Sequence, residues 1–370
     1  MYIFPIRTIS RISRKRRLKW AITTLAVYGA AHAIVDAACA ALVLSHLSSG
    51  RVETGYFALL IIIYNALAFM TQPLIGLISD RFKISYTFAA IGCVLAAISA
   101  LLYEYPMISV VIAGLGNAFF HVGGGIISLN VFRHKASAPG MFVAPGALGL
   151  LVGTVIGVSG SYVSPTFMFL LLCSGVGILL LKQPKIVYST SSELRFEPYH
   201  LIMLLLLCSI SIRGIVGFVV NFSWGSNKLL IICLTIAIVL GKGIGGILGD
   251  KFGWRRITMV GLLLSAPLIA FGNYPLAGIL GMFLFNLTMP IILTAVANLL
   301  PGYPGFAFGM NSLALVTGVF ITYFSIGSFL SNDWIVFGII LFSAVMLNKS
   351  LGLYLGDSEK VKIKELNIKI

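Results

Sequence analysis

Five ionisable side chains interrupt the long apolar runs of this 370-residue sequence. They are His32, Asp36, His121, Arg213 and Lys242. Ionisable groups are costly inside a membrane and usually face a bundle interior or a watery cavity, so each one is a functional candidate. Asp36 is the only acid deep within an apolar run. These residue types can exchange protons and can bind a charged solute.

His32 and Asp36 are four residues apart, so they share one face of a helix. Burial favours the protonated form of a carboxyl and a nearby cation favours the ionised form, so Asp36 can accept and release a proton. Arg213, from a later run, is its expected partner. Two readings stay open. Asp36 and His32 couple transport to protons, or Asp36 forms a static pair with Arg213 or His32 that only joins helices.

His121 and Arg213 are candidates for contact with a solute. Three glycines at 123–125 follow His121 and permit a helix bend or a close backbone approach. The alternative for His121 is a bond to a neighbouring carbonyl. If Arg213 and Lys242 face inward, the cavity is net positive and favours an anionic or zwitterionic solute, although Lys242 can instead extend to the surface. Neutral hydrogen-bonding groups for the same site come from Asn117, Asn286 and Thr288.

The sequence contains no pattern of an enzyme or of a cofactor site. The glycines at 123–125 lack the Lys-Ser/Thr ending of a nucleotide-binding loop. All five cysteines fall inside apolar runs without a C-x-x-C pair, and no metal-ligand spacing occurs. We therefore expect no catalysis, no cofactor and no metal, and transport driven by an ion or solute gradient.

The elements that must position these residues are membrane helices. The chain is 59% hydrophobic and 10% charged, whereas soluble domains contain about 25% charged residues. Apolar runs of about 20 residues without alternation predict helices rather than a barrel. We expect an all-α polytopic membrane protein with twelve transmembrane helices at about 19–46, 54–78, 85–103, 107–131, 140–162, 166–182, 200–221, 229–248, 256–273, 275–299, 305–330 and 334–354.

The distribution of positive charge predicts the orientation. Of the 26 Lys and Arg residues, 22 fall on the side of the two termini, and only Arg51 and Lys228 fall on the other side. By the positive-inside rule, both termini are cytoplasmic and the helices cross the cytoplasmic membrane. The net charge of +15 resides in these loops. We therefore expect contact with membrane lipid and no nucleic-acid partner.

The two halves repeat one pattern. The segment 76–83 follows the second run and has a copy at 246–253, and Pro-Gly pairs open the fifth and eleventh runs. Gly153 and Gly318 lie at the same distance from these pairs, and 114–121 resembles 281–288. The predicted organisation is a basic segment 1–18, two pseudo-symmetric six-helix halves at 19–182 and 200–355, a linker 183–199 and a cytoplasmic tail 356–370.

The segment Gly-Leu-Ile-Ser-Asp-Arg-Phe-Lys at 76–83, its copy and the six-plus-six layout resemble the major facilitator superfamily. A narrower resemblance to exporters of the fosmidomycin-resistance type rests on His32, Asp36 and the segments 114–121 and 301–305. Proton-driven drug exporters often carry an Arg where Val110 stands, and the segment 140–162 lacks the glycine–proline arrangement of the antiporter signature. The resemblance implies that the first, fourth, seventh and tenth helices line a central cavity.

The resemblance also implies a cytoplasmic gate. Gly76 permits close helix approach, and Asp80 is expected to face the helix N-terminus at Gly305, where a carboxylate is stabilised. Asp250 would face the helix start at Gly140. Arg81 and Arg133 are expected to complete a charge cluster. The alternative is that the charged residues of the 76–83 loop are only solvated.

These features predict a secondary transporter that moves a small solute or drug by alternating access, with an anionic solute expected if the cavity is net positive. Proton-coupled export is the expected mode, and a monomer is the expected state. Uptake of a small organic anion by a symporter or facilitator is the alternative within transport. A membrane enzyme acting on lipid would need a catalytic constellation near an interface, which the sequence does not contain. A non-transporting sensor or scaffold would need a partner-binding tail, and 356–370 is short and plain.

Overall fold

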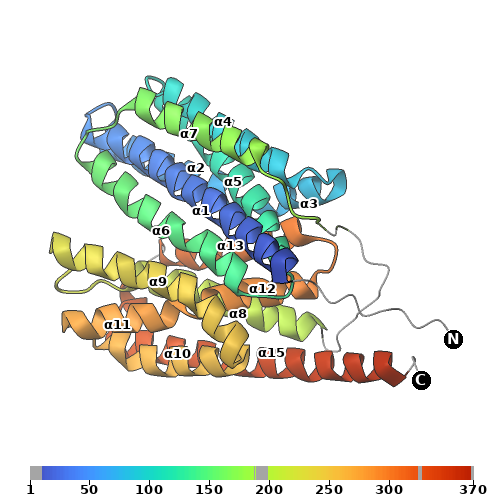
Figure 1. The fold of residues 1–370 in the computed structure, drawn as a ribbon. Helices are drawn as coiled ribbons and strands as arrows, with labels where there is room; N and C mark the ends of the chain where they lie inside the picture. The colour runs from blue at the N-terminus through green and yellow to red at the C-terminus, as the bar shows by residue number, and fades with distance from the viewer. Residues whose placement is uncertain (1–10, 187, 189–198, 324–326, 368–370) are drawn as a thin grey trace.

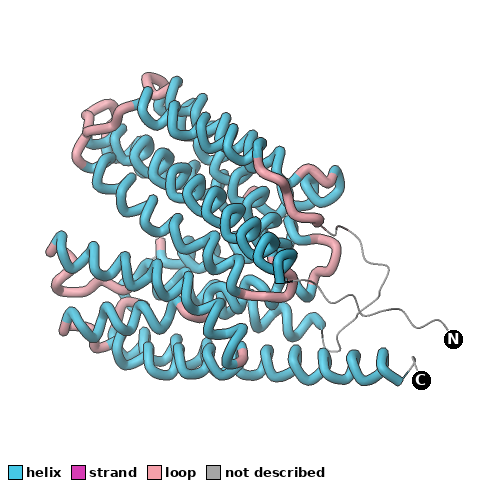
Figure 2. Tube along the Cα trace, viewed as in Figure 1, coloured by secondary structure: helices cyan, strands magenta, loops and turns pink. Residues whose placement is uncertain are grey.

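The computed structural model describes residues 11–186, 188, 199–323 and 327–367, which are helical apart from short connections (Figure 2). The remaining residues of the expected N-terminal segment, linker and tail lie outside the described part. Nine helices in the described part are long and apolar enough to cross a membrane. With α4, α7 and α10, each of 17 residues, they make twelve spans. The chain is therefore an all-α, multi-pass membrane protein, as predicted.

The first half, residues 11–180, packs as one bundle (Figure 1). Its elements are α1 (Arg11–Ser48), α2 (Thr54–Asn65), the π-helix η1 (Ala66–Met70), α3 (Gln72–Phe82), α4 (Ser85–Leu101), α5 (Pro106–Val131), α6 (Ser137–Val158) and α7 (Ser164–Leu180).

The second half forms the other bundle (Figure 1). Its elements are α8 (Tyr199–Val219), α9 (Lys228–Phe252), α10 (Trp254–Ala270), α11 (Pro275–Asn286), α12 (Met289–Leu299), α13 (Pro304–Thr322), α14 (Gly327–Leu330) and α15 (Asp333–Asn367). The eleventh span was expected to reach residue 330, but α13 ends at Thr322 and α14 is a separate short helix. The helix of α15 also continues into the segment that was expected to be a tail.

Two spans are interrupted in the middle. The second span passes from α2 through η1 to α3, and the tenth breaks between α11 and α12. Pro73 and Pro290 stand at the start of α3 and α12. Proline lacks the backbone N–H and clashes with the preceding turn, so the helix register changes there. By contrast, α5 continues unbroken through the three glycines at 123–125. These glycines therefore serve close packing rather than a break: a Cβ on Gly123 would lie 2.4 Å from Ala89 N.

The two halves meet through equivalent helices. In the contact between them, α3 packs on α13 and α6 packs on α9. Within the halves, α1 packs on α6 and α8 packs on α13, and the matched glycines lie in these last two contacts. Gly153 approaches the Ala37 carbonyl, and Gly318 approaches the Ser211 carbonyl. The repeat seen in the sequence is thus a repeat of helix packing.

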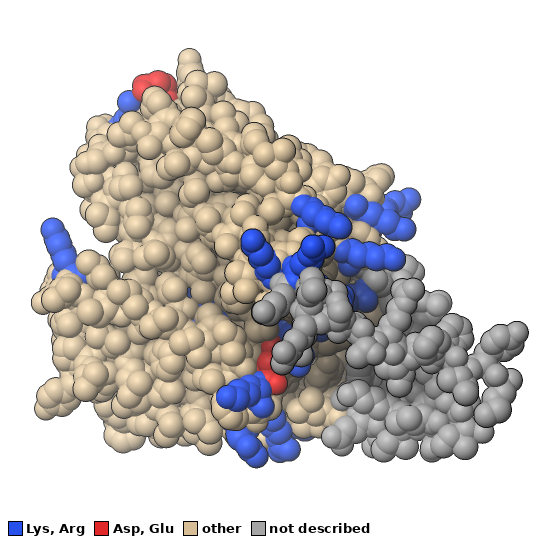
Figure 3. Space-filling model, in the orientation of Figure 1, with Lys and Arg blue, Asp and Glu red and all other residues tan. Residues whose placement is uncertain are grey.

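Positive charge marks one end of the molecule. Most of the Lys and Arg side chains visible in Figure 3 gather toward the end where α1 begins and α15 finishes (Figures 1 and 3). We call this end the basic end. Arg51 and Lys228 lie in the opposite connections, at the end of α1 and the beginning of α9.

Candidate functional site

Three ionisable side chains of the first half form one buried cluster. His32 and Asp36 project from α1, and His121 projects from α5. His32 Nε2 lies 3.2 Å from Asp36 Oδ2, and His121 Nε2 lies 3.6 Å from Asp36 Oδ1. The two histidines are 4% and 8% exposed. The Asn117 amide, also on α5, donates to Asp36 Oδ1 at 3.1 Å. The structure thus brings together four residues that the sequence selected separately.

Backbone carbonyls fix the orientation of both imidazoles. His32 Nδ1 is 2.8 Å from the Phe142 carbonyl oxygen, and His121 Nδ1 is 2.9 Å from that of Asn117. A carbonyl oxygen only accepts hydrogen bonds, so each Nδ1 carries a proton. Each Nε2 therefore presents either a lone pair or a second, exchangeable proton to the Asp36 carboxylate. The bond to a neighbouring carbonyl, offered as an alternative role for His121, here accompanies its place in the cluster.

Gly146 of α6 completes the wall of this cluster. A Cβ on Gly146 would lie 2.4 Å from His32 Nε2 and 2.7 Å from Asp36 Oδ2. Any larger residue would fill the space beside the reactive atoms. The sequence showed that this span is rich in glycine, but nothing in the spacing distinguished Gly146 from the other glycines. Its role follows from the packing of α1 on α6.

Arg213 of α8 lies in the second half and has neutral partners. Its guanidinium donates to the Phe285 carbonyl at 2.9 Å, to Asn286 Oδ1 at 3.4 Å and to the Thr288 hydroxyl. It also stacks 4.5 Å above the Phe285 ring. The expected Asp36–Arg213 pair is therefore not formed. Asp36 takes its partners from α5 and its own helix, while Arg213 is held by the broken span α11–α12.

The two sites occupy equivalent positions of the repeat. His32 and His121 are adjacent in the first half, with ring centroids 4.5 Å apart. Arg213 and Thr288 are bonded in the second half. The sequence alignment of the halves pairs His32 with Arg213 and 114–121 with 281–288. One repeat therefore carries titratable groups where the other carries a permanent cation.

Arg213 has no acidic partner within the described residues, and its Nε is buried without a hydrogen-bond partner there. The half-buried Lys242 of α9 is close enough to both Arg213 and Asp36 to interact electrostatically. Its ammonium makes no hydrogen bond or ion pair to any described residue. A small cavity of about 60 Å³ adjoins Arg213 where the halves meet, lined in part by Val143, Phe308 and Asn311. The region thus holds two cations, neither of which forms an ion pair with a described residue.

Two carboxylates join the halves at the basic end. Asp80 of α3 accepts from the N–H groups of Gly305 and Phe306, each at 2.9 Å. Asp250 of α9 accepts from those of Ala136 and Ser137, at 2.9 and 3.0 Å. Each carboxylate thus binds the free N–H groups at a helix N-terminus of the other half. Asp250 was expected to contact the helix start at Gly140. It binds about one turn earlier in the sequence, because α6 begins at Ser137.

Close backbone contact accompanies both pairs. A Cβ on Gly76 would lie 2.3 Å from Gly305 O, and a Cβ on Gly246 would lie 2.2 Å from Ala136 O. We call these two contacts, Gly76–Asp80 with Gly305–Phe306 and Gly246–Asp250 with Ala136–Ser137, the latches. Both are formed in this structure, so the halves are joined at the basic end.

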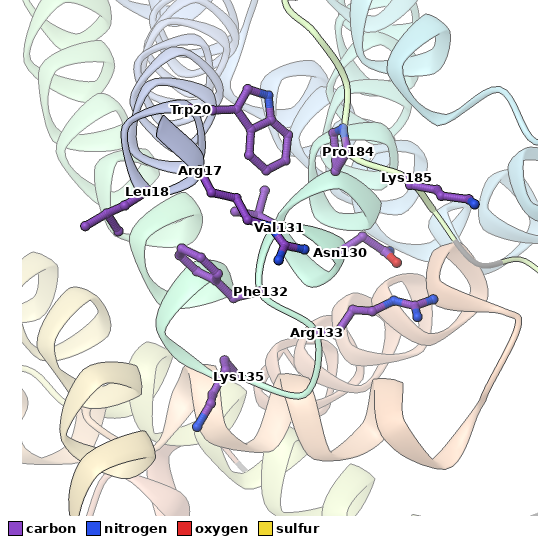
Figure 4. A pocket seen from close by; sticks show the side chains of 10 residues that line it. All are labelled: Arg17, Leu18, Trp20, Asn130, Val131, Phe132, Arg133, Lys135, Pro184 and Lys185. Atoms are coloured by element: carbon purple, nitrogen blue, oxygen red, sulfur yellow. The ribbon is translucent and has the colours of Figure 1, made fainter. Parts of the chain in front are cut away.

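The expected charge cluster around Arg81 and Arg133 is not formed. Both side chains are exposed, and neither makes an ion pair with a described residue. Asp80 is instead satisfied by backbone N–H groups. Arg133 lines a cavity of about 810 Å³ at the basic end, together with Arg17, Lys135 and Lys185 (Figure 4). This depression lies between the beginning of α1, the end of α5 and the connections 132–135 and 184–185, and no acidic side chain among the described residues lines it.

Comparison with solved structures identifies the architecture. The chain is similar to the E. coli fucose:proton symporter FucP, at 11% identity and a TM-score of 0.66, covering 90% of this chain and 99% of that one. It is also similar to a bacterial homologue of the iron transporter ferroportin in an outward-facing state, at 11% identity and a TM-score of 0.62, with 92% and 99% covered. The human organic anion transporter MFSD10 matches at 15% identity and a TM-score of 0.62, with 91% and 98% covered.

No family model matches the sequence, and no curated protein does. The narrower resemblance to fosmidomycin-resistance exporters stays a prediction, because none of these three structures is such an exporter. The structural likeness extends over nine-tenths of the chain in each case. The chain is a multi-pass membrane protein with the twelve-helix fold of the major facilitator superfamily.

Proposed function

We propose that the chain is a secondary transporter that moves a small anionic solute across the cytoplasmic membrane by alternating access, coupled to protons. The observation that carries this proposal is that the two halves place different ionisable groups at equivalent positions. One half holds a titratable cluster around Asp36, and the other holds a buried cation, Arg213. Ionisable groups persist inside a membrane protein where they serve a pathway. In transporters built from two repeats, substrate sites lie at the interface between the repeats.

The anionic solute is inferred from the charge around Arg213. A buried cation without a counter-ion is costly, and a bound anion removes that cost. Arg213 Nε has no hydrogen-bond partner among the described residues, and Lys242 lies within electrostatic range. A carboxylate or phosphonate would accept from both cations. The organic anion transporter among the similar structures is consistent with this solute class.

The proton is inferred from the cluster of the first half. Both Nε2 atoms face one carboxylate, so the three groups hold protons that can leave when the site opens to water. The static alternative, in which Asp36 forms a pair with Arg213 or His32 that only joins helices, predicts no effect of these protons on transport. The similarity to a fucose:proton symporter agrees with the coupled reading.

Alternating access is inferred from the latches. Asp80 and Asp250 each bind a helix N-terminus of the opposite half, so both contacts must break before the basic end opens. The free energy needed to break these two charge-assisted contacts is a barrier to opening of the basic end. Export is the direction that we propose, from the resemblance to exporters. Uptake is the alternative direction, and the transport experiment below distinguishes it from export.

Counterflow in proteoliposomes tests this function without assuming a coupling ion. Vesicles loaded with one unlabelled carboxylate or phosphonate from a panel are diluted into a trace of the same labelled compound. We expect transient accumulation of label for at least one anion, and none for cationic drugs of similar size. Preparations of known orientation then give the direction. If every anion fails while the protein is folded and correctly inserted, the proposed function is wrong.

A further inference from the structure

The cluster around Asp36 has the composition of a metal site, although the spacing in the sequence did not indicate one. Two imidazole nitrogens and one carboxylate oxygen, from His32, His121 and Asp36, lie within 4.8 Å of one another. We propose that these three residues bind a divalent first-row transition-metal ion such as Zn²⁺. Imidazole and carboxylate are the ligand types that such ions take in proteins.

The distances fit a single ion. Zinc–nitrogen and zinc–oxygen bonds of about 2.0–2.1 Å put neighbouring ligand atoms of a tetrahedron about 3.3 Å apart. The carboxylate oxygens of Asp36 lie 3.2 Å from His32 Nε2 and 3.6 Å from His121 Nε2. The two rings stand nearly perpendicular, at 87°. Small side-chain rotations would bring all three ligands onto one ion.

The surroundings of the ligands match those of a metal site. In proteins, a metal-binding histidine usually donates its other ring N–H to a carbonyl or carboxylate, which fixes the tautomer. Here both Nδ1–H groups donate to backbone carbonyls, of Phe142 and Asn117. Both Nε2 atoms are thereby directed at the carboxylate. In the deprotonated cluster, the lone pairs of the two Nε2 atoms and of the carboxylate repel one another. A cation bound between these atoms relieves that repulsion.

Two further features leave room for the ion and for a fourth ligand. Gly146 presents no side chain to His32 Nε2 and Asp36 Oδ2, so a space remains that a Cβ would fill. Asn117 contacts the same carboxylate, and its buried Oδ1 accepts no hydrogen bond among the described residues. Rotation of this amide would turn Oδ1 toward the cluster.

This inference concerns binding alone and does not rest on the proposed transport. The metal would occupy the atoms that the proposed function assigns to protons, so bound metal displaces those protons. Binding can therefore succeed where transport fails, and transport can succeed where metal binding fails.

The test is titration of the purified full chain with Co²⁺ and Zn²⁺ in detergent. The protein carries no polyhistidine tag and is first treated with a chelator. We expect one Co²⁺ per chain with visible absorption bands typical of nitrogen and oxygen ligands, and displacement of these bands by one Zn²⁺. His121→Gln should weaken binding by roughly tenfold or more, because it removes a ligand. His46→Gln replaces a buried histidine of α1 outside the cluster and should bind like wild type.

Gly146→Ala provides a second variant that keeps all three ligands. Its methyl group would occupy the space beside His32 Nε2 and should also abolish or weaken Co²⁺ binding. Gly177→Ala is the matched control, because its Cβ would meet only a Val27 side-chain carbon, 3.8 Å away. Size-exclusion chromatography and thermal unfolding confirm that each variant is folded. The proposal is overturned if folded wild type binds neither ion at micromolar concentration, or if His121→Gln binds as tightly as wild type.

Discussion

At the scale of single residues, the side chains of Asp36 and Arg213 differ in the partners that surround their charges. Asp36 meets two imidazoles, which balance a carboxylate when they are protonated, and an amide that donates a hydrogen bond to it. Arg213 meets an amide oxygen, a carbonyl and a hydroxyl, which carry only partial charge. Neutral acceptors satisfy hydrogen bonds without balancing a full charge. Arg213 is therefore the residue that gains most from an anionic solute.

We predict that Arg213→Gln weakens the apparent affinity for the transported anion by about tenfold or more. A hydrogen bond to a charged group contributes about 1.5–3 kcal/mol, and 1.4 kcal/mol corresponds to tenfold. The measurement is the solute concentration that gives half-maximal counterflow. Arg255→Gln, which changes an exposed arginine bonded to Asn348, is the control.

The same variant separates binding from folding. Arg213→Gln removes an uncompensated buried charge, so the unfolding temperature should stay the same or rise. A variant with unchanged anion affinity would show that Arg213 does not contact the solute. A large fall in unfolding temperature would instead mean that Arg213 mainly holds α8 against α11.

At the scale of helices, the latches depend on both charge and close contact. The carboxylates of Asp80 and Asp250 use N–H groups that every helix leaves free at its beginning. Gly76 and Gly246 allow the backbones to approach closely enough for these bonds. The two latches join similar helices of the repeat, so weakening one lowers the barrier to opening without removing it.

We predict that Asp80→Asn shifts the protein toward a state open at the basic end. Loss of the charge weakens the bonds to Gly305 and Phe306, because a hydrogen bond to a charged group contributes about 1.5–3 kcal/mol and a neutral one about 0.5–1.5 kcal/mol. Spin labels at the exposed positions Lys83 and Tyr303, in a background without native cysteines, report the separation of the halves by pulsed electron resonance. A longer distance should gain population in the variant.

Glu104→Gln is the control for this experiment. Glu104 pairs with Arg51 at the opposite end, within one half, at 2.9 Å between Oε1 and Nη2. Its neutralisation should leave the label distance unchanged. If Asp80→Asn also gives the wild-type distance distribution, Asp80 is not a latch.

Gly76→Ala tests the contact itself. Its methyl group would overlap the Gly305 backbone, which cannot rotate away as a side chain can. Overpacking of this kind costs about 1–3 kcal/mol. We expect a lower unfolding temperature than for Gly55→Ala, whose Cβ would meet nothing within 4 Å. Equal unfolding temperatures would contradict the tight contact.

The helices followed from the sequence more completely than the site did. Run length and the repeat predicted twelve spans, because a membrane helix needs a minimum apolar length. The breaks near Pro73 and Pro290 and the helical continuation of α15 were missed, since apolar runs do not indicate helix register. His32 and Asp36 were selected together from their spacing, whereas His121 was selected on its own. The meeting of His121 with this pair depends on how α1 packs against α5, which no local spacing encodes.

At the scale of the whole molecule, charge and latches distinguish the two ends. Positive side chains gather at the basic end (Figure 3), and both latches join the halves there. The positive-inside rule predicts that this end is cytoplasmic. Fusion of green fluorescent protein after residue 370 should therefore give fluorescent cells, since the protein fluoresces when folded in the cytoplasm. A periplasmic alkaline phosphatase fused there should be inactive, and the reverse pattern would contradict the orientation.

The central claim is that a solute crosses the membrane in exchange with, or together with, protons held at Asp36. The most direct test is solute-driven proton movement in proteoliposomes with a pH dye inside, comparing wild type with Asp36→Asn. We expect a pH change on addition of a transported anion to wild type, and none in Asp36→Asn although its counterflow persists. If Asp36→Asn still moves protons with the solute, or if wild type transports with no proton movement, the coupling assigned to Asp36 is wrong.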